Sequence, residues 1–487
     1  MARAAYRPQC PPRADNEPLF LQISRQIARD IQGRVLRPGS PLPGSRELSR
    51  SLGVHRNTAL AALAELSAQG WIQTEPRRGT FVSETIPERE PRRFARRVSV
   101  PTRRAELPEP APEPFPDFGP DVLPLLGGLP DYRLVPTAEL ARAYRRALAR
   151  APRLLGYGSA YGEPRLRSVL AAQLRDKRGL SVDAEGLMIT RGSQMALFLL
   201  GRALATPGQL VAVEGVGYAP AWESLRLAGA KLVPVPVDAQ GLSISSLETL
   251  LSKERLAAVY ITPHHQYPTT VTLSASRRLQ LLALARRHGF VVIEDDYDHE
   301  HHYDGRPVLP LASVDPEVVA YVGTLSKVLA PGLRIGYLAA RPDIVERAVK
   351  ARSYVDRCGD HALERAVAEL SEDDSLGRHV RRVRREYGAR RDALVAELGR
   401  RLGGALSFRV PHGGMALWAK ITERGVSSEA WAERALERRV LVLAGRRFRF
   451  DGRDAPFLRL GFAPLDGREI ALAVERLAAA MPTARAR

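Results

Sequence analysis

One lysine has the setting that covalent chemistry requires. Lys327 closely follows an apolar run, 319–323, that predicts a strand, and only 6 of the chain's 73 lysine and arginine residues are lysines. An amine can form a Schiff base with an aldehyde, whereas a guanidinium cannot. Thr324, Ser326 and Arg334 lie near the lysine in sequence and can hold a phosphate dianion. This string suggests a site for an aldehyde cofactor that carries a phosphate.

Two further side chains suit a pyridine ring. Asp295 and Tyr297 follow the apolar run 290–294. A pyridine cofactor needs a carboxylate at its ring nitrogen, which keeps the ring protonated and electron-withdrawing, and it benefits from a donor near its ring hydroxyl. Open α/β sheets bind ligands at the carboxyl ends of their strands, where these residues are expected. The alternatives for this acidic string are a metal site and a solvated turn.

Three more positions can contact the same ligand. Ser193 and Gln194 begin a helix after a strand, where backbone amides can cradle a phosphate. Tyr218 can stack on a ring, although a tyrosine in this setting more often belongs to a core. Arg459 lies inside the apolar strand 457–462, and a buried arginine needs an anionic partner. That partner is either a ligand carboxylate or an internal carboxylate of the protein.

The elements that must position these side chains are strands and helices that alternate over the C-terminal part of the chain. Short apolar runs alternate there with helical patterns. The expected strands are Leu187–Thr190, Leu210–Glu214, Leu232–Val237, Ala257–Thr262, Phe290–Glu294 and Val319–Gly323. Such an alternation predicts the α/β fold class, with a mainly parallel sheet covered by helices.

The N-terminal part has the pattern of a helix-turn-helix. Leu19–Gln32 carries apolar residues at helical spacing. A short helix is expected over 46–52, capped by Ser45 and ended by Gly53, and another over about 55–69. Two short helices joined by a tight turn that contains glycine form a helix-turn-helix.

A hairpin follows the second short helix. Leu60, Leu63 and Leu66 of that helix are expected to face inward. Two short strands are expected over 70–74 and 79–82, with a basic loop between them. The arrangement predicts a winged helix-turn-helix.

Several side chains of this motif suit a DNA duplex. The second short helix begins with groups whose fork geometry reads guanine and adenine edges in the major groove. Arginines of the wing and of the preceding helix can meet phosphates or the minor groove. The predicted DNA contacts are Arg46, His55, Arg56, Asn57, Thr58, Arg77 and Arg78. The alternative is a helical hairpin that serves only for packing.

Charge favours a polyanionic partner. The net charge is +19, and residues 1–105 carry 19 arginines, no lysine and 9 acidic residues. A basic N-terminal segment attracts nucleic acid. The alternative is a general preference for arginine over lysine, which the whole chain shows.

Composition also bears on location. Cys10 and Cys358 are too few for a disulfide scaffold or a zinc site, and no metal is expected. The sequence contains no run of about 18 apolar residues, so no membrane span is predicted. The first 17 residues lack the apolar core of a signal peptide. The expected location is a reducing cytoplasm.

Three regions differ in composition. Residues 16–84 form the expected DNA-binding domain, and 85–115 form a linker rich in proline and arginine. The linker arginines either add non-specific DNA affinity or are simply solvated. Residues 116–487 form the ligand-binding region, with a large part over about 135–345 and a small part over about 346–487.

The N-terminal region resembles the winged helix of the GntR family. The blocks that match are Pro18-Leu19-Phe20, Gln22-Ile23, Leu42-Pro43-Gly44-Ser45-Arg46-Glu47-Leu48, Leu52-Gly53-Val54-His55-Arg56-Asn57-Thr58 and Gly79-Thr80-Phe81-Val82. Members of this family usually carry serine where this chain has His55, so a ring nitrogen replaces the usual helix cap.

The C-terminal region resembles fold-type I pyridoxal phosphate enzymes of the aminotransferase class. The resemblance implies that Lys327 is the internal aldimine lysine, with Asp295 at the pyridine nitrogen and Tyr297 at the ring hydroxyl. It further implies that Tyr218 lies over the ring and that Arg459 binds the carboxylate of an effector. The phosphate ligands that it implies are Ser193, Gln194, Thr324, Ser326 and Arg334.

Both regions together resemble the MocR subfamily of GntR regulators. That resemblance implies a seven-stranded sheet with a smaller C-terminal α+β subdomain, and pyridoxal 5'-phosphate as the cofactor. It implies a homodimer, commonly head-to-tail, that binds a double-stranded DNA operator and senses an amine, an amino acid or pyridoxal phosphate. The alternative is an active aminotransferase with an appended DNA-binding domain, because the residues for that chemistry are present.

Overall fold

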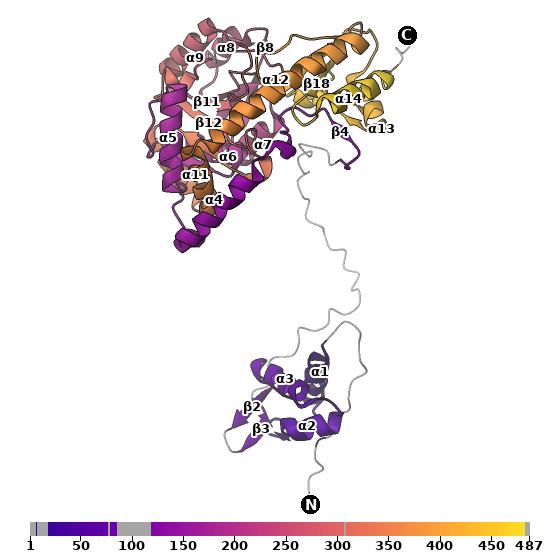
Figure 1. Ribbon diagram of the computed structural model, residues 1–487. Coiled ribbons are helices and arrows are strands. Elements are labelled where there is room, and N and C mark those ends of the chain that lie inside the picture. Colours follow the sequence, from indigo (N-terminus) through magenta and orange to yellow (C-terminus); the bar gives the residue numbers. More distant parts are fainter. Residues whose placement is uncertain (1–5, 7–17, 76–77, 85–117, 306–307, 483–487) are drawn as a thin grey trace, which may run out of the picture. The chain divides into compact units, whose positions relative to one another are not determined.

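The chain divides into two compact units, Met1–Glu109 and Pro110–Arg487 (Figure 1). The computed structural model describes residues 6, 18–75, 78–84, 118–305 and 308–482. The predicted linker and Arg77 lie outside the described residues. Each unit has its own hydrophobic core and is described by itself.

Over its described residues, the N-terminal unit has three helices and a small antiparallel sheet in the order β1-β3-β2. Ile23, Ile27 and Ile31 form the buried stripe of α1, which packs on α3. The elements are α1 (Leu19–Gln32), β1 (Pro41–Leu42), α2 (Ser45–Leu52), α3 (Arg56–Ala68), β2 (Ile72–Glu75) and β3 (Gly79–Val82). The predicted winged helix-turn-helix is therefore present, with β1 as a further strand.

Two local predictions about this unit were wrong. Ser45 is the first residue of α2 and caps nothing, because Gly44 takes the cap position with extended backbone. Leu60 is 54% exposed. The buried stripe of α3 runs through Ala59 and Ala62 instead, and these small side chains allow α1 to approach closely. By contrast, Gly53 ends α2 with a φ of 65°, as its type predicts.

The C-terminal unit is built on the predicted seven-stranded sheet, in the order β5-β13-β12-β11-β10-β6-β7. All neighbouring pairs are parallel except those that involve β13. The strands are β5 (Leu187–Thr190), β6 (Leu210–Glu214), β7 (Lys231–Val235), β10 (Leu256–Ile261), β11 (Val291–Asp296), β12 (Val319–Thr324) and β13 (Gly336–Ala339). The carboxyl ends of β6, β10, β11 and β12 thus meet at one edge of the sheet.

Helices cover both faces of this sheet because its strands are apolar on both sides (Figure 1). One face is covered by α5 (Pro164–Arg178), α8 (Ile244–Leu251), α9 (Ala275–His288) and α11 (His361–Glu372). The other face is covered by α6 (Gly192–Leu204), α7 (Ala219–Leu227) and α10 (Pro342–Arg352). Alternate residues of one strand face the two cores, as Met188 and Ile189 of β5 do. A further helix, α4 (Thr137–Arg150), packs on α11.

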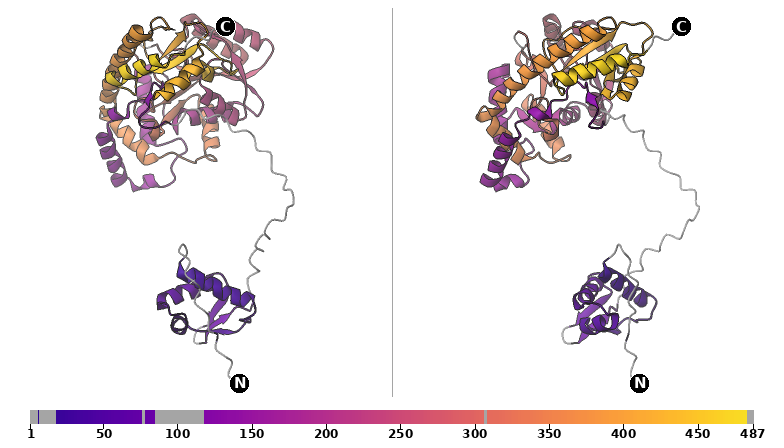
Figure 2. Two further views of the ribbon diagram at one scale, coloured as in Figure 1. Left: turned by 90° about the vertical axis from the view of Figure 1, so that its right-hand side faces the viewer. Right: turned by 45° about the vertical axis from the view of Figure 1, so that its right-hand side comes forward.

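A smaller α+β part follows the long helix α12 (Ser375–Leu402), which contributes to the cores of both parts. Figure 2 shows α14 beside α12, and the two helices share one core. The other elements of this part are β14 (Leu406–Ser407), β15 (Ala416–Ile421), α13 (Ser428–Glu437), β16 (Val440–Leu441), β17 (Leu443–Ala444), β18 (Phe457–Gly461) and α14 (Gly467–Ala479). One strand from earlier in the chain, β4 (Leu123–Pro124), pairs with β16 in parallel.

None of the helices in the described parts of the chain is both long enough and apolar enough to span a bilayer.

Candidate functional site

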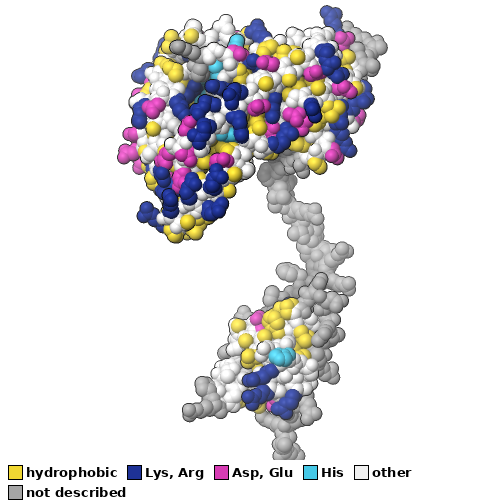
Figure 3. Space-filling model, in the orientation of Figure 1, with side chains coloured by type: hydrophobic (Ala, Val, Ile, Leu, Met, Phe, Trp, Pro, Cys, Tyr) yellow, Lys and Arg dark blue, Asp and Glu magenta, His cyan; other side chains and the backbone are white. Residues whose placement is uncertain are grey.

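The start of α3 exposes the side chains predicted to read DNA. His55 occupies the N-cap, and its Nδ1 accepts a hydrogen bond from the backbone N–H of Asn57 at 3.2 Å. The ring nitrogen therefore takes the place of the hydroxyl that usually caps this helix. Arg56 and Asn57 are exposed in the first turn, and Thr58 is half-buried. Figure 3 shows basic side chains on a face of this unit where a histidine is also exposed.

Two arginines that are predicted to contact the DNA backbone lie on elements beside α3. Arg46 is exposed on α2. Arg78 lies at the tip of the β2–β3 hairpin with 74% of its side chain exposed, and it pairs with Glu75 at 2.5 Å. A surface pair of this kind contributes little to stability, so Arg78 can exchange Glu75 for a phosphate at small cost. Both arginines are available for the contacts that position a duplex.

In the C-terminal unit, a cavity of about 280 Å³ lies at the carboxyl ends of the strands. All nine residues that the sequence predicts around the cofactor line it, although they come from four separate stretches of the chain. They are Ser193, Gln194, Tyr218, Asp295, Tyr297, Thr324, Ser326, Lys327 and Arg334. Six further residues that line it were not predicted as contacts: Gly127, Gly128, Tyr260, Thr262, Tyr267 and Pro331.

Lys327 presents its amine to this cavity just beyond the end of β12. Its Nζ donates a hydrogen bond to the backbone oxygen of Gly128 at 2.7 Å. Burial and the nearby guanidinium of Arg459 lower the pKa of Lys327 to about 8. In the turn before the lysine, the backbone N–H of Ser326 donates to Oγ1 of Thr324 at 3.1 Å. The lysine is thus held in place and is easily deprotonated, as a nucleophilic amine must be.

Asp295 offers one carboxylate oxygen to the cavity. Its Oδ2 accepts a hydrogen bond from the hydroxyl of Tyr260 at 2.9 Å, whereas Oδ1 is buried and has no partner among the described residues. Burial, together with the charge of Asp296, raises the pKa of Asp295 to about 7. A buried acceptor without a donor is costly, and the protonated nitrogen of a pyridine would supply that donor. Tyr297 donates its hydroxyl proton to the backbone oxygen of His265 at 3.0 Å.

The start of α6 forms a concave surface beside Arg334. Gly192 has a φ of 77°, and a Cβ at this position would lie 3.0 Å from a guanidinium nitrogen of Arg334. Ser193 and Gln194 follow Gly192 in the first turn of the helix, where backbone amides have no partner within the helix. A phosphate fits this surface because the amides, the positive end of the helix and the arginine all attract negative charge.

Arg459 lies deeper, and a tyrosine ring packs on its guanidinium. The side chain is 1% exposed, and its Cζ lies 4.1 Å from the centre of the Tyr267 ring. Its Nε and Nη1 have no hydrogen-bond partner, and the described residues offer it no carboxylate. A buried guanidinium without an anion is costly, so this arginine is suited to an anionic group of a ligand.

Tyr267 is central to the site, although it is not among the contact residues predicted from the sequence. Its ring packs edge-on against Tyr218 at 5.0 Å and against Tyr297 at 6.1 Å between ring centres. The available signal was its position in the polar string 262–269 after β10, at the same sheet edge as Asp295. That signal does not tell which of the polar residues faces the ligand.

A buried acid–histidine pair lies beside Tyr297. His265 Nδ1 and Asp298 Oδ1 lie 2.8 Å apart, and both side chains are almost fully buried. Although burial opposes it, the charge of Asp298 raises the pKa of His265. The two residues follow the neighbouring strands β10 and β11, and the backbone oxygen of His265 accepts the hydroxyl proton of Tyr297. Among the described residues no group of three or more side chains is arranged to hold a metal ion.

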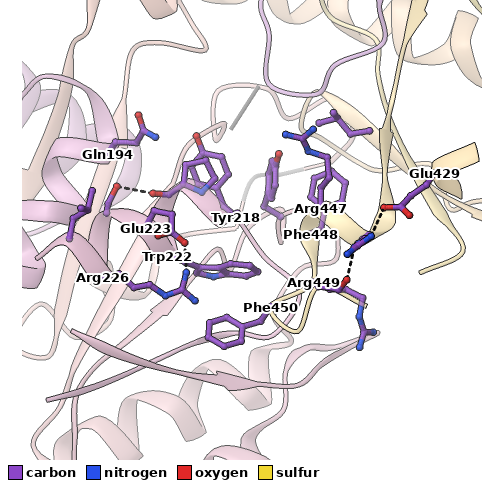
Figure 4. Close-up of a pocket in the computed structure, with 18 residues that line it drawn as sticks. Gln194, Tyr218, Trp222, Glu223, Arg226, Glu429, Arg447, Phe448, Arg449 and Phe450 are labelled. Atoms are coloured by element: carbon purple, nitrogen blue, oxygen red, sulfur yellow. Dashed lines mark hydrogen bonds and ion pairs between the residues drawn. The ribbon is translucent and has the colours of Figure 1, made fainter. Parts of the chain in front are cut away.

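A wider chamber of about 860 Å³ adjoins the cavity and shares Gln194, Tyr218 and Tyr267 with it (Figure 4). One wall is α7 and the other is the loop 445–450 of the small part. The backbone of this loop is bonded to the loop 215–217, with Gly217 N donating to Phe448 O at 2.8 Å. The chamber gives a ligand room to extend beyond the cofactor cavity.

Two family models match the chain. The model for aminotransferase class I and II matches residues 121–477, and the model for bacterial regulatory proteins of the gntR family matches residues 19–82. The first covers more than half of the chain.

A relative that contains both regions decides the subfamily. The probable rhizopine catabolism regulatory protein MocR of Rhizobium meliloti is 31% identical over 417 residues, which are 85% of this chain and 84% of that protein. The chain belongs to the MocR-type GntR regulators. The predicted subfamily, the α/β fold and the function as a DNA-binding transcription regulator are thereby confirmed.

Other MocR-type regulators and aminotransferases are also similar to the chain. The pyridoxine biosynthesis regulator PdxR of Corynebacterium glutamicum is 31% identical over 378 residues, which are 78% of each chain. The structure of the α-aminoadipate aminotransferase LysN of Thermus thermophilus, in complex with N-(5'-phosphopyridoxyl)-L-leucine, is 32% identical with a TM-score of 0.69. The match covers 74% of this chain and 92% of the LysN chain. The predicted pyridoxal phosphate cofactor of this MocR-type regulator is therefore confirmed.

The pKa of Lys327 predicts how this MocR-type regulator takes up its cofactor. Only the neutral amine attacks an aldehyde, and a pKa of about 8 makes roughly 300-fold more of it at pH 7 than an ordinary lysine would have. The rate of covalent uptake by the cofactor-free protein should therefore rise about tenfold per pH unit and level off above about pH 8. Stopped-flow absorbance measures this rate, and a rate that still climbs at pH 10 would assign Lys327 an ordinary pKa.

Proposed function

We propose that this regulator senses a primary amine that carries a carboxylate, and that this effector changes its affinity for an operator. The observation that carries the proposal is a buried arginine without a carboxylate partner among the described residues, close to the lysine of the cofactor cavity. The amine of Lys327 lies at the cofactor cavity, and the guanidinium of Arg459 is buried near it with no anionic partner in the part of the chain that the structure describes. The cofactor's aldehyde reacts with a primary amine and Arg459 attracts a carboxylate, and an amino acid carries both groups.

Pyridoxal phosphate, when bound, supplies an aldehyde that reacts with amines and a ring that draws electrons from the product. The chain's own residues hold and orient it. We assign the ring nitrogen to Asp295 Oδ1 and one face of the ring to Tyr218. We assign the ring hydroxyl to Tyr297, whose proton is presently donated to a backbone oxygen. The phosphate is assigned to Ser193, Gln194, Thr324, Ser326 and Arg334.

The carboxylate preference can be tested at Arg459. Replacing Arg459 with lysine keeps the positive charge but removes the paired N–H groups that bind a carboxylate. We expect the concentration of amino acid that shifts the cofactor's absorbance to rise by roughly 10- to 100-fold. The response to a simple amine without a carboxylate should not change, which provides the internal control. An equal loss for both ligands would mean that Arg459 does not bind the carboxylate.

We propose that the regulator is a homodimer with a head-to-tail arrangement. An exposed apolar patch on the C-terminal unit supports self-association, since patches of this kind commonly mark interfaces. It consists of Leu155, Tyr157, Tyr354 and Val355, which are 53–89% exposed. Arg357 stacks on the Tyr157 ring at 4.4 Å and links the two segments. Light scattering of the full-length chain should give twice the 53.6 kDa of one protomer.

The second candidate function is catalysis of transamination. Lys327, Asp295 and Tyr297 lie together as an aminotransferase would need them, and aminotransferases are among the similar structures. We assign regulation first because the chain carries a DNA-reading unit with an exposed recognition helix. Repeated turnover of an amino donor with a keto acid, at about 1–10³ per second, would favour the enzyme.

The decisive experiment combines two readouts on the full chain. An absorbance spectrum is taken with pyridoxal phosphate, before and after borohydride, while candidate amino acids are titrated. Operator binding is then measured at the same amino acid concentrations. An effector can shift an equilibrium only by its difference in affinity for the two states, so spectral and operator titrations should share a midpoint. If an amino acid shifts the spectrum but does not change the operator affinity, transamination would be the better supported function.

A further inference from the structure

The chain that leads from the N-terminal unit joins the C-terminal unit at the ligand site. Residues 118–129 (the 118–129 segment) directly follow residues 85–117. The backbone N–H of Leu125 donates to Leu441 O at 3.0 Å, and its oxygen accepts from Gly461 N at 2.8 Å. Side chains of this segment pack in one cluster with Tyr218, Tyr267 and Tyr297. The segment therefore belongs to the wall of the cavity.

Gly127 lies directly against the guanidinium of Arg459. A Cβ at this position would lie 2.0 Å from Nη1 of Arg459 and 2.7 Å from the Cβ of Ala416. Separations this short are not tolerated, so even a methyl group would displace either the arginine or the backbone of the segment. The position of Arg459 and that of the segment are thus mutually dependent.

Gly128 contacts the other cation of the site. Its backbone oxygen accepts the hydrogen bond from Lys327 Nζ at 2.7 Å, and its φ of 81° lies in the region that favours glycine. Lys327 and Gly128 are 199 residues apart in sequence. Two adjacent glycines therefore contact the two functional side chains. Gly128 contacts Lys327, which bonds the cofactor, and Gly127 contacts Arg459, which is assigned to the effector's carboxylate.

We propose that Gly127 and Gly128 are positioning residues through which both ligands act on the segment that leads to the DNA-binding unit. The inference rests on the proposed function of the site. When Lys327 bonds to the aldehyde carbon, the aldehyde oxygen leaves as water and the nitrogen keeps at most one hydrogen instead of three. At most one N–H then remains to donate to Gly128, so the attachment of the 118–129 segment to the lysine is weakened or lost. A carboxylate that binds Arg459 acts on the same segment next, because the guanidinium that Gly127 contacts turns toward the carboxylate.

The test compares Gly127→Ala with Gly119→Ala in the full chain. Gly119 belongs to the same segment, but a Cβ there meets nothing within 4 Å, so this variant is the matched control. Hydrogen exchange of the 118–129 segment is measured without cofactor, with pyridoxal phosphate, and with N-(5'-phosphopyridoxyl)-glycine. This last probe fills the cofactor and carboxylate positions without bonding to Lys327. Operator affinity is measured in the same three states.

In the wild type and in Gly119→Ala, cofactor loading should raise exchange of the segment about three- to tenfold, as expected for the loss of one hydrogen bond. In Gly127→Ala, exchange should already be high without a ligand, and operator affinity should no longer respond to either probe. Lys327→Ala provides a second variant that introduces no clash. Its cofactor-free form should show the segment exchange of the loaded wild type.

Two results would overturn the inference while the proposed function stands. One is a wild type whose operator affinity responds to ligand although exchange of the segment stays constant. The other is a Gly127→Ala protein with a full operator response. A wild type that forms no borohydride-sensitive band would instead overturn the proposed function, and this inference with it.

Discussion

Replacing Lys327 with alanine is expected to abolish the cofactor absorbance band that borohydride can trap. The side chain presents the amine at the cofactor cavity, and neither methyl nor guanidinium groups can replace it in bonding to an aldehyde. Pyridoxal phosphate would then be held only by its phosphate, ring nitrogen and ring face. It should be removed by dialysis, whereas the wild type should retain it.

The matched control is Lys420→Ala, because Lys420 is exposed on β15 and does not line the cavity. This variant should keep the band. Both proteins should still bind operator DNA, since the N-terminal unit folds around its own core. A trapped band in Lys327→Ala would assign the covalent role to another amine and would remove the main support for the proposed site.

Replacing Arg56 with alanine should weaken specific operator binding by about 10- to 100-fold. The side chain is exposed at the first position of α3, where a recognition helix presents its groups to base edges. A bidentate arginine–guanine contact contributes about 1–3 kcal/mol of discrimination. Because the lost contact is to a base, affinity for unrelated DNA should fall much less. Fluorescence anisotropy with both duplexes at fixed salt separates these effects.

Arg29→Ala provides the control for loss of charge alone, since Arg29 is exposed on α1 outside the helix-turn-helix. It should lower both affinities slightly and equally, through the general attraction of basic groups to phosphates. If Arg56→Ala behaved in the same way as Arg29→Ala, Arg56 would be a phosphate contact and the bases would be read by other residues of α3.

The N-terminal unit shows where sequence reasoning reaches its limit. Leu19–Gln32 was predicted as a helix with the bounds that α1 has, because its apolar spacing marks one face. Leu60 was misplaced because three leucines at equal spacing suggest a stripe, whereas the buried stripe follows alanines. The size of the gap between α1 and α3 decides which side chains fit, and that gap is a property of the packed unit.

The cofactor site also contains some residues that could be predicted from the sequence and others that could not. Asp295, Tyr297 and Lys327 could be predicted together because each lies at or just after the end of a strand, and parallel strands have their carboxyl ends at one edge. The 118–129 segment could not be placed there. Its pattern carries no sign of a partner, and its contacts with Lys327 and Arg459 span hundreds of residues.

The sequence by itself determined the two kinds of unit, six of the seven strands of the large sheet, and the chemical character of the ligand site. These properties rest on local periodicity, on glycine turns and on rare side chains such as Lys327, which neighbouring residues set. Only the tertiary structure decided that Tyr267 covers Arg459, that His265 pairs with Asp298, and that Gly128 holds Lys327. Such contacts join distant parts of the chain, and close packing selects among many chemically reasonable partners.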